Sequence, residues 1–277
     1  MISATPESLC EVCGSDDSCE IGIAREYTNG QPLHVCRDCG FVFVRDRRSS
    51  TDIARAWEKS DVGTPIYAAD LASVEARHAY VARIAQDYLH KSVLDIGSGD
   101  GAFLQLLKEK FKVQNLFGVS PSQSDCDTMM DRGIPCFRGL GEDCNERGWD
   151  AVTLIWTLEN TGSCKAMVQA AREMLNEDGY LVVATGSRIL VPFKKPLDRY
   201  LGAAPLDLHP WRFTANTLGR LLLANGFRLE FVNGFVDSDY LIVIGRKSDA
   251  RPGDLTPKDD YRKVLKFFRD WHGIQAL

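Results

Sequence analysis

Apolar strand-like segments alternate with amphipathic helical segments through most of the chain, and this alternation constrains the fold more than any other feature. Strand-like segments lie at 91–97, 114–119, 134–137, 149–156 and 179–185. Helical segments lie at 100–111, 121–133, 164–175 and 213–226. Such alternation predicts an α/β fold, with a mostly parallel sheet covered by helices on both faces. The last two strand-like segments, 226–235 and 237–247, follow one another directly and predict a hairpin.

The first strand-to-helix turn is rich in glycine and is preceded by an acidic residue. It reads D-x-G-x-G-x-G and comprises Asp95, Gly97, Gly99 and Gly101. Glycines let the backbone approach a ligand closely, and the following helix offers free N–H groups at its N-terminus. The leading carboxylate disfavours a pyrophosphate, so we expect a nucleotide-like ligand that carries positive charge here. A turn that serves only packing is the alternative.

Two pairs of cysteines near the start of the chain have the spacing of a metal site. They are Cys10, Cys13, Cys36 and Cys39, in the sequences CEVCG and CRDCG. Four thiolates close a tetrahedral zinc site, and a closed site is structural because no position remains for a substrate. Alternating segments at 20–28, 31–36 and 41–44 favour short strands, which makes this region a zinc ribbon.

Two alternatives remain open for this cysteine-rich region. The cysteines could be redox dithiols instead of metal ligands. Cys19 and His34 also lie close enough in the sequence to replace one of the four ligands. The other cysteines are scattered, and we interpret them as small apolar side chains: Cys126, Cys136, Cys144 and Cys164.

These patterns divide the chain into four parts. They are a zinc ribbon (1–48), a helical connector (49–90), the α/β domain (91–248) and a linker with a C-terminal helix (249–277). The connector either packs only on the α/β domain or covers its ligand site with Tyr67. The C-terminal helix is amphipathic, so it docks on the body or on a second copy, which leaves a homodimer open.

Composition excludes several classes of protein. No run of about 18 apolar residues is present, so no membrane span is expected. The N-terminus lacks a basic and then apolar leader, which favours a cytoplasmic protein. The net charge of −5 disfavours a nucleic acid partner, because no overall positive field attracts a polyanion.

The α/β region resembles the class I S-adenosylmethionine-dependent methyltransferases over about 75–247. The resemblance rests on VLDIGSGDGAFL, GVSPS, GLGEDCNERGWDAVTLIWTLEN, AREMLNEDGYLVVAT and HPWRFTANTLGRLLLANGF. It implies a Rossmann-like sheet of seven strands, with an antiparallel last strand that the terminal hairpin inserts. The CxxCG pair is similar to that of sugar C-methyltransferases of deoxysugar pathways.

The resemblance also assigns cofactor contacts to residues at the strand ends. The methionine portion of the cofactor is assigned to Asp95, Gly97, Ser98, Gly99 and Gly101. The adenine is assigned to the GLGED turn, with Glu142 and Asp143. The reactive end is assigned to Trp156 and Thr157. A solvated turn at 142–143 and a core aromatic at 156 are the plainer alternatives.

Ser120 departs from the family, which commonly ends this strand with an acidic residue that binds both ribose hydroxyls. A serine makes one uncharged hydrogen bond instead, at a cost of about tenfold in affinity. This difference weakens cofactor binding without abolishing it. We therefore expect Ser120→Asp to tighten cofactor binding if Ser120 faces the ribose.

A second departure concerns the catalytic base. Relatives often carry histidines where this chain has Trp156 and Asn160, and Glu159 is the ionisable group that remains between them. A base is needed only for a hydroxyl or carbon acceptor. His209 is the best candidate, with Glu159 and Tyr67 as weaker ones, and His209 could equally serve packing.

The loop at 187–211 carries the expected substrate contacts. Its cations could grip the diphosphate of a nucleotide-linked sugar or could simply be solvated; they are Arg188, Lys194, Lys195 and Arg199. The leading hypothesis is a methyltransferase for a sugar, a nucleotide-linked sugar or a polysaccharide precursor. An RNA methyltransferase is disfavoured by the acidic charge balance, and a non-catalytic scaffold that retains the fold is a third hypothesis.

Overall fold

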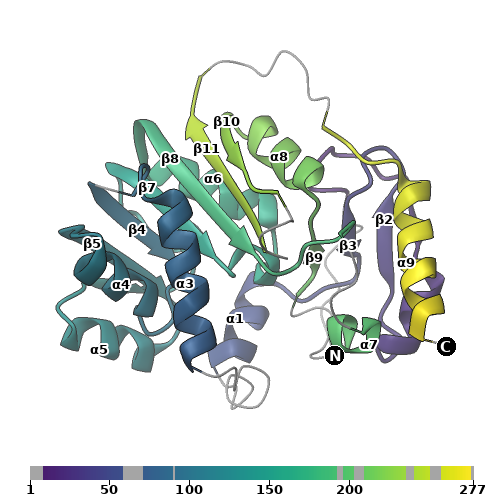
Figure 1. The fold of residues 1–277 in the computed structure, drawn as a ribbon, viewed down its shortest axis with the longest axis horizontal. Helices are drawn as coiled ribbons and strands as arrows, with labels where there is room; N and C mark the ends of the chain where they lie inside the picture. The colour runs from purple at the N-terminus through teal and green to yellow at the C-terminus, as the bar shows by residue number, and fades with distance from the viewer. Residues whose placement is uncertain are drawn as a thin grey trace.

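The computed structural model describes residues 9–58, 71–89, 91–191, 196–202, 209–234, 240–249 and 257–275. Its centre is a seven-stranded sheet in the order β10-β11-β8-β7-β4-β5-β6 (Figure 1). The strands are β4 (Ser92–Ile96), β5 (Asn115–Ser120), β6 (Cys136–Arg138), β7 (Trp149–Ile155), β8 (Leu175–Thr185), β10 (Phe227–Val232) and β11 (Leu241–Lys247). β11 lies between β8 and β10 and runs antiparallel to both. The predicted seven-stranded, mostly parallel sheet is confirmed.

Helices cover both faces of this sheet. One face carries α3 (Leu71–Ala85), α4 (Ala102–Lys110) and α5 (Gln123–Asp131), and the other carries α6 (Cys164–Met174) and α8 (Ala215–Ala224). Neighbouring residues of β4 point to opposite faces. Val93 packs in the same cluster as Leu104 of α4, whereas Leu94 packs in the cluster of Val168 of α6. The parallel strands are therefore buried on both sides, which explains their continuous apolar sequences.

The N-terminal residues form a second, antiparallel sheet with one strand from far along the chain. Its strands are β1 (Ser18–Glu20), β2 (Leu33–Cys36), β3 (Val42–Val44) and β9 (Trp211–Arg212). β9 pairs with β3 in the register Val42 with Arg212 and Phe43 with Trp211. The sequence at 22–27, where we predicted a strand, is a 3-10 helix, η1 (Gly22–Tyr27). Burial of both Ile21 and Ala24, three residues apart, suits a helical turn.

An aromatic stack joins the two sheets. The Phe41 ring stacks on Trp211, with centroids 5.8 Å apart, and on Phe43 at 5.9 Å. All three side chains belong to the hydrophobic cluster that contains Leu94 and Val152 of the larger sheet. The Trp211 indole Nε1 also donates a hydrogen bond of 2.7 Å to the carbonyl of Thr161. The N-terminal sheet and the larger sheet therefore share one core.

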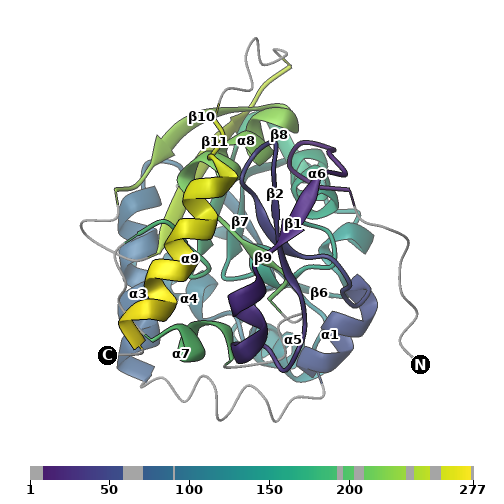
Figure 2. The ribbon, with the colours of Figure 1, turned by 90° about the vertical axis from the view of Figure 1, so that its right-hand side faces the viewer.

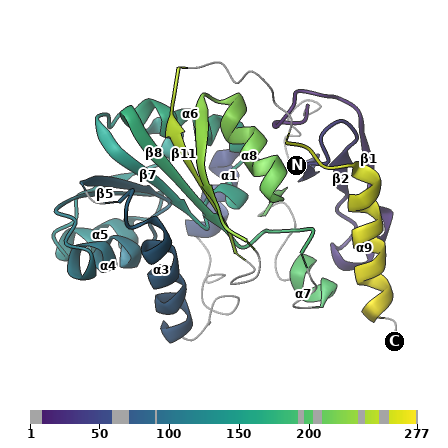
Figure 3. The same cartoon turned by 45° about the horizontal axis from the view of Figure 1, so that its top comes forward.

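The C-terminal helix α9 (Tyr261–Gln275) packs against the N-terminal sheet, at the end of the molecule away from α4 and α5 (Figures 2 and 3). Val264, Phe268 and Trp271 are buried with Leu33 and Val35 of β2. The docking of this amphipathic helix on the body agrees with one of the two expected arrangements. Two more helices complete the described fold, α1 (Ser50–Glu58) and the short α7 (Leu197–Leu201). None of the helices in the described ranges is both long and apolar enough to cross a bilayer.

One interpretation of the cysteines is wrong. Cys126 of α5 and Cys136 of β6 form a disulfide, whereas we interpreted both as small apolar side chains. Their separation in the sequence carries no information about the approach of α5 to β6, which depends on the packing of the sheet. Cys144 and Cys164 are buried free thiols, as expected.

Candidate functional site

A cavity of about 290 Å³ opens at the carboxyl ends of β4, β5 and β7. Open α/β sheets bind ligands at this edge, where the loops that follow the strands converge. The lining includes the glycine-rich turn, the end of β5, Glu142 and Trp156. Ser50 and Ile53 of α1 also line the cavity, so part of the helical connector covers it.

Two glycines of the first turn serve different purposes. Gly97 has a φ of +75°, and a Cβ there would meet Thr157 Oγ1 at 2.4 Å. Gly99 has a φ of +52° and lines the cavity, yet a Cβ there would meet no heavy atom within 4 Å. Gly97 is therefore required by packing, whereas Gly99 borders space that a ligand can occupy.

Three other residues assigned to this turn lie outside the cavity lining. Asp95 is buried and accepts a hydrogen bond of 2.5 Å from Thr153 Oγ1. Burial raises the pKa of Asp95 to about 7, because desolvation disfavours the carboxylate. The Ser98 hydroxyl donates to the carbonyl of Val119, and Gly101 forms the N-cap of α4. These residues hold the turn in shape.

Glu142 and Asn160 both line the cavity and each has a buried side-chain oxygen without a hydrogen-bond partner among the described residues. Glu142 is the charged one of the two. Its Oε2 is buried and accepts no hydrogen bond from any described residue, and burial raises the pKa of its carboxyl. A buried acceptor of this kind suits an N–H donor on a ligand. Asp143 follows in the same 3-10 turn, η2 (Gly141–Asp143), but it is exposed and does not line the cavity.

The end of β5 presents a serine and a carboxylate together. Ser120 lines the cavity, and only 1% of its surface is exposed. Its hydroxyl donates a hydrogen bond of 3.0 Å to Asp125 Oδ2, and Asp125 also lines the cavity. Sequence reasoning missed Asp125. The available signal is an acidic residue in the first turn of the helix that follows the strand.

An aromatic residue, Trp156, also lines the cavity. Trp156 has a φ of +55°, in the left-handed region that costs a non-glycine residue about 1–2 kcal/mol. Its ring contacts Tyr240 and His78, with centroids 5.5 and 5.6 Å away. Burial lowers the pKa of His78, which keeps its imidazole neutral at physiological pH. His78 belongs to α3 and was also missed, because nothing in the local sequence links it to Trp156.

The expected catalytic residues are not gathered in the cavity. Glu159 is buried behind it, where Oε1 accepts from the Gly186 N–H at 3.2 Å, and burial raises the pKa of Glu159. His209 precedes β9, and its carbonyl accepts a hydrogen bond from the Arg212 guanidinium. Neither residue lines the cavity. Tyr67 lies outside the described residues.

The two cations of the loop at 187–211 that the structure describes, Arg188 and Arg199, have different environments. Arg188 is buried, and its guanidinium donates to the carbonyls of Tyr240 and Asn233 at 3.2 and 3.4 Å. Arg199 is exposed on α7, and Lys194 and Lys195 lie outside the described residues. Arg188 thus stabilises the backbone, and its suggested contact with a diphosphate has no support from this arrangement.

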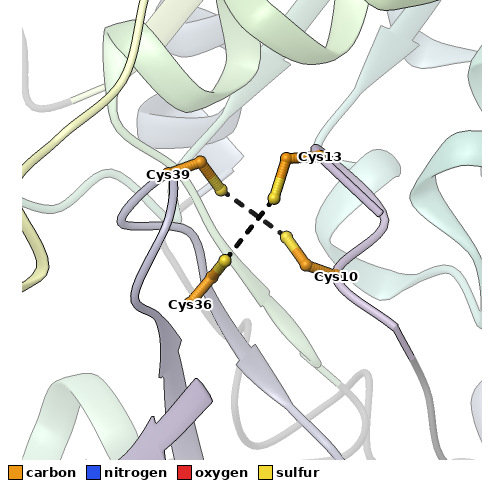
Figure 4. A group of neighbouring side chains, drawn as sticks. All are labelled: Cys10, Cys13, Cys36 and Cys39. Atoms are coloured by element: carbon orange, nitrogen blue, oxygen red, sulfur yellow. Dashed lines mark hydrogen bonds between the residues drawn. The ribbon is translucent and has the colours of Figure 1, made fainter. Parts of the chain in front are cut away.

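The four N-terminal cysteines converge on one point (Figure 4). All four sulfurs lie within 4.8 Å of one another. The Sγ atoms of Cys10 and Cys39 are 3.6 Å apart, and those of Cys13 and Cys36 are 3.5 Å apart. A tetrahedral site with zinc–sulfur bonds of about 2.3 Å requires sulfurs about 3.8 Å apart. The cluster therefore fits one tetrahedral metal ion.

The two alternative metal ligands lie outside this cluster. Cys19 is not among the four converging residues, and the Nδ1 atom of His34 pairs instead with the Ser18 hydroxyl at 3.3 Å. The backbone of the two cysteine loops is equivalent, because Gly14 N–H bonds to Cys10 O and Gly40 N–H bonds to Cys36 O. The four-cysteine set predicted from the spacing is thus brought together.

Comparison with known families identifies the larger domain. The family model for a methyltransferase domain matches residues 67–231. The chain belongs to this methyltransferase family. The domain is a class I S-adenosylmethionine-dependent methyltransferase, and its match spans the glycine-rich turn, the strands β4 to β8 and the cavity lining except the residues of α1. A search of curated proteins finds no match to this methyltransferase.

Solved structures share the fold of the methyltransferase at low sequence identity. The 1,6-didemethyltoxoflavin-N1-methyltransferase of Burkholderia thailandensis is 16% identical with a TM-score of 0.56, over 76% of this chain and 97% of that chain. Magnesium protoporphyrin IX methyltransferase of Synechocystis is 12% identical with a TM-score of 0.52, over 72% and 97%. The [4+2]-cyclase SpnF is 14% identical with a TM-score of 0.55, over 73% and 97%. At these identities the likeness shows the fold alone.

Proposed function

We propose that the cavity binds S-adenosylmethionine and that the enzyme transfers its methyl group to a small molecule. The observation that carries this proposal is the buried Oε2 of Glu142, which lacks a partner among the described residues and faces a cavity that Gly99 leaves open. The exocyclic amine of adenine is a donor that fits Glu142. The backbone at Gly97 and Gly99 accommodates the methionine portion.

The residues of the cavity have distinct functions in this proposal. When bound, S-adenosylmethionine supplies an electrophilic methyl group on a cationic sulfonium. Asp95, whose pKa burial raises to about 7, would lie at the start of the turn that holds the methionine portion, and Ser98 and Gly101 keep that turn in shape. Trp156 and Thr157 form the wall at the reactive end and exclude water from it, so that the reacting atoms can be brought into line.

The residue that deprotonates the acceptor is not fixed by the cavity lining, which contains none of the described candidates. His209, Glu159 and Tyr67 remain candidates, and His78 joins them because its neutral imidazole contacts Trp156. Alanine variants of these four residues distinguish the candidates. The base is the residue whose loss lowers kcat without changing the affinity for S-adenosylhomocysteine.

The proposed acceptor is a sugar, a nucleotide-linked sugar or a polysaccharide precursor, and the proposed metal is structural Zn²⁺. The similarity of the CxxCG pair to that of sugar C-methyltransferases supports the acceptor class. The convergence of four sulfurs supports the metal. A methyl-transfer assay with a panel of sugar nucleotides, against aromatic amines and phenols of similar size, tests the acceptor class. Transfer to the aromatic compounds alone refutes it.

Calorimetric titration with S-adenosylhomocysteine tests the cofactor site. Glu142→Ala is expected to weaken binding about tenfold, because the ligand loses one buried acceptor. Asp143→Ala is the matched control, since it removes a neighbouring carboxylate that is exposed and outside the cavity. Absence of binding to the unaltered protein at millimolar ligand rejects the enzyme and favours a non-catalytic scaffold.

A further inference from the structure

Asp125 and Ser120 form a bonded pair at the end of β5, where the cavity wall passes from strand to helix. The Ser120 hydroxyl donates to Asp125 Oδ2 at 3.0 Å, and both residues line the cavity. Asp125 Oδ1 accepts no hydrogen bond from the residues that the structure describes. A carboxylate has about four acceptor positions, and Ser120 occupies one of them.

Ser120 itself is poorly placed to hold two ribose hydroxyls. Its single proton is directed to Asp125, and its oxygen also lies 3.3 Å from the Ser122 N–H. Only 1% of the residue is exposed. The proton and one of the two acceptor positions of the hydroxyl are thus occupied within the protein, so Ser120 cannot hold both ribose hydroxyls and instead orients the carboxylate beside it.

Asp125 is held in place by the start of α5. The Ser122 hydroxyl accepts from the Asp125 N–H at 3.3 Å and caps the helix. Burial raises the pKa of Asp125, and the hydrogen bond from the Ser120 hydroxyl acts in the opposite direction by stabilising the carboxylate. One side-chain contact, with Ser120, and one backbone contact, with Ser122, therefore fix the position of this carboxylate before a ligand arrives.

We propose that Asp125 is the residue that binds the ribose hydroxyls of the cofactor, and that Ser120 positions it. This inference rests on the proposed function, because it assumes a nucleoside in the cavity. The acidic group expected at residue 120 is supplied five residues later, from the first turn of α5. The carboxylate reaches the same edge of the sheet, since Ser120 and Asp125 are in contact.

Isothermal titration tests the inference with two ligands, S-adenosylhomocysteine and its 2′,3′-dideoxy analogue. Asp125→Asn is expected to weaken binding of S-adenosylhomocysteine about 10- to 100-fold, because a charge-assisted double contact is lost. It is expected to leave binding of the dideoxy analogue unchanged within about twofold. Asp127→Asn is the matched control, since Asp127 is exposed on the same helix and pairs with Gln123 outside the cavity.

Ser120→Ala tests the positioning residue. As a single substitution it is expected to weaken binding of S-adenosylhomocysteine about 3- to 10-fold. Added to Asp125→Asn, it is expected to have no further effect. A merely structural serine would lower the affinity for both ligands in both backgrounds. Circular dichroism and thermal melting confirm that each variant folds.

The outcomes separate this inference from the proposed function. If the unaltered protein fails to bind S-adenosylhomocysteine, the proposed function is wrong. If the unaltered protein binds and Asp125→Asn binds equally well, the assignment of Asp125 is wrong while the cofactor site stands. A loss of affinity in Asp125→Asn that is equal for both ligands also overturns the assignment, because the ribose hydroxyls would then not be involved.

Discussion

Glu11 and Arg47 form a buried ion pair, with Glu11 Oε1 2.7 Å from Arg47 Nη2 and the side chains 13% and 8% exposed. Glu11 lies between the first two cysteines, and its Oε2 accepts from the Ser163 hydroxyl and the Lys165 N–H at the start of α6. Arg47 donates to the carbonyl of Gly162 at 2.9 Å. The pair therefore connects the cysteine cluster to the segment that follows the cavity residues Trp156 and Thr157.

Glu11→Ala is expected to lower the free energy of unfolding by about 3 kcal/mol, because Arg47 would remain buried without its partner. Urea denaturation measures this change. Asp17→Ala is the matched control, since the pair of Asp17 with Arg37 is about half exposed and contributes at most about 1 kcal/mol. Equal losses in the two variants would show that the buried pair has no special importance.

Metal analysis by mass spectrometry is expected to find about one zinc ion per chain. Cys13→Ser should lose the metal and also weaken binding of S-adenosylhomocysteine several-fold, because the loop that carries Glu11 would lose its anchor. Cys144→Ser removes a buried thiol outside the cluster and should retain the metal. Full zinc occupancy in Cys13→Ser would contradict the four-cysteine assignment.

Asp95 is expected to make stability depend on pH. The folded pKa of about 7 lies above the value of about 3.9 in the unfolded chain, so the folded state binds the extra proton between these values. Stability therefore falls as pH rises from 4 to 7, by at most about 4 kcal/mol, and levels off above 7. Asp95→Asn removes this loss and should be more stable than the unaltered protein at pH 8.

Urea denaturation at pH 5 and pH 8 measures the effect of Asp95→Asn. Asp150→Asn provides a control of opposite sign, because the hydrogen bond from Ser92 lowers the pKa of Asp150. That carboxylate contributes stability above its unfolded pKa, so its loss should destabilise the protein at pH 8. The predicted gain in stability of Asp95→Asn over the unaltered protein is larger at pH 8 than at pH 5. A gain that is smaller at pH 8 than at pH 5 would refute the raised pKa of Asp95.

Ser120→Asp is now expected to weaken binding of S-adenosylhomocysteine, which reverses the expectation drawn from the sequence. The new carboxylate would replace a buried hydroxyl that donates to Asp125, and two adjacent carboxylates repel one another. Titration calorimetry and urea denaturation should both record a loss. Tighter binding in Ser120→Asp would restore the ribose contact to residue 120.

Gly99→Ala and Gly97→Ala are expected to separate binding from stability. Gly99→Ala adds a methyl group to open cavity space, so it should cost only about 1 kcal/mol of stability while weakening S-adenosylhomocysteine binding at least tenfold. Gly97→Ala places its Cβ against Thr157 and should lose more stability. Urea denaturation and calorimetry measure the two quantities. Unchanged ligand affinity in Gly99→Ala would mean that no ligand occupies this space.

The sequence predicted what depends on local patterns. Periodicity placed the strands of the larger sheet, and the spacing of Cys10, Cys13, Cys36 and Cys39 grouped these residues correctly. The sequence did not predict β9, because a strand of two residues is too short to show an alternating apolar pattern. Its partner β3 also lies far away in the sequence. Tertiary packing also decided the Cys126–Cys136 disulfide.

The candidate site was also predictable only where its residues belong to local sequence patterns. Gly97, Gly99 and Glu142 lie in the loops that follow β4 and β6, so their meeting at one edge follows from the fold class. Asp125 and His78 come from helix surfaces, and their approach to the cavity depends on how α5 and α3 lie against the sheet. The resemblance assigned the ribose contact to residue 120 because it compares positions along the chain. The carboxylate of Asp125 lies instead on the next element, α5.

The stack of Phe41 on Trp211 has a consequence for how such proteins can be recombined. The cysteine-bearing sheet is completed by β9, which the chain supplies after passing through most of the methyltransferase domain. A graft of residues 9–48 onto another methyltransferase would lack its fourth strand and leave Phe41 without its neighbour. The exchangeable unit is therefore discontinuous, and a working chimera must carry residues 211–213 together with the N-terminal segment.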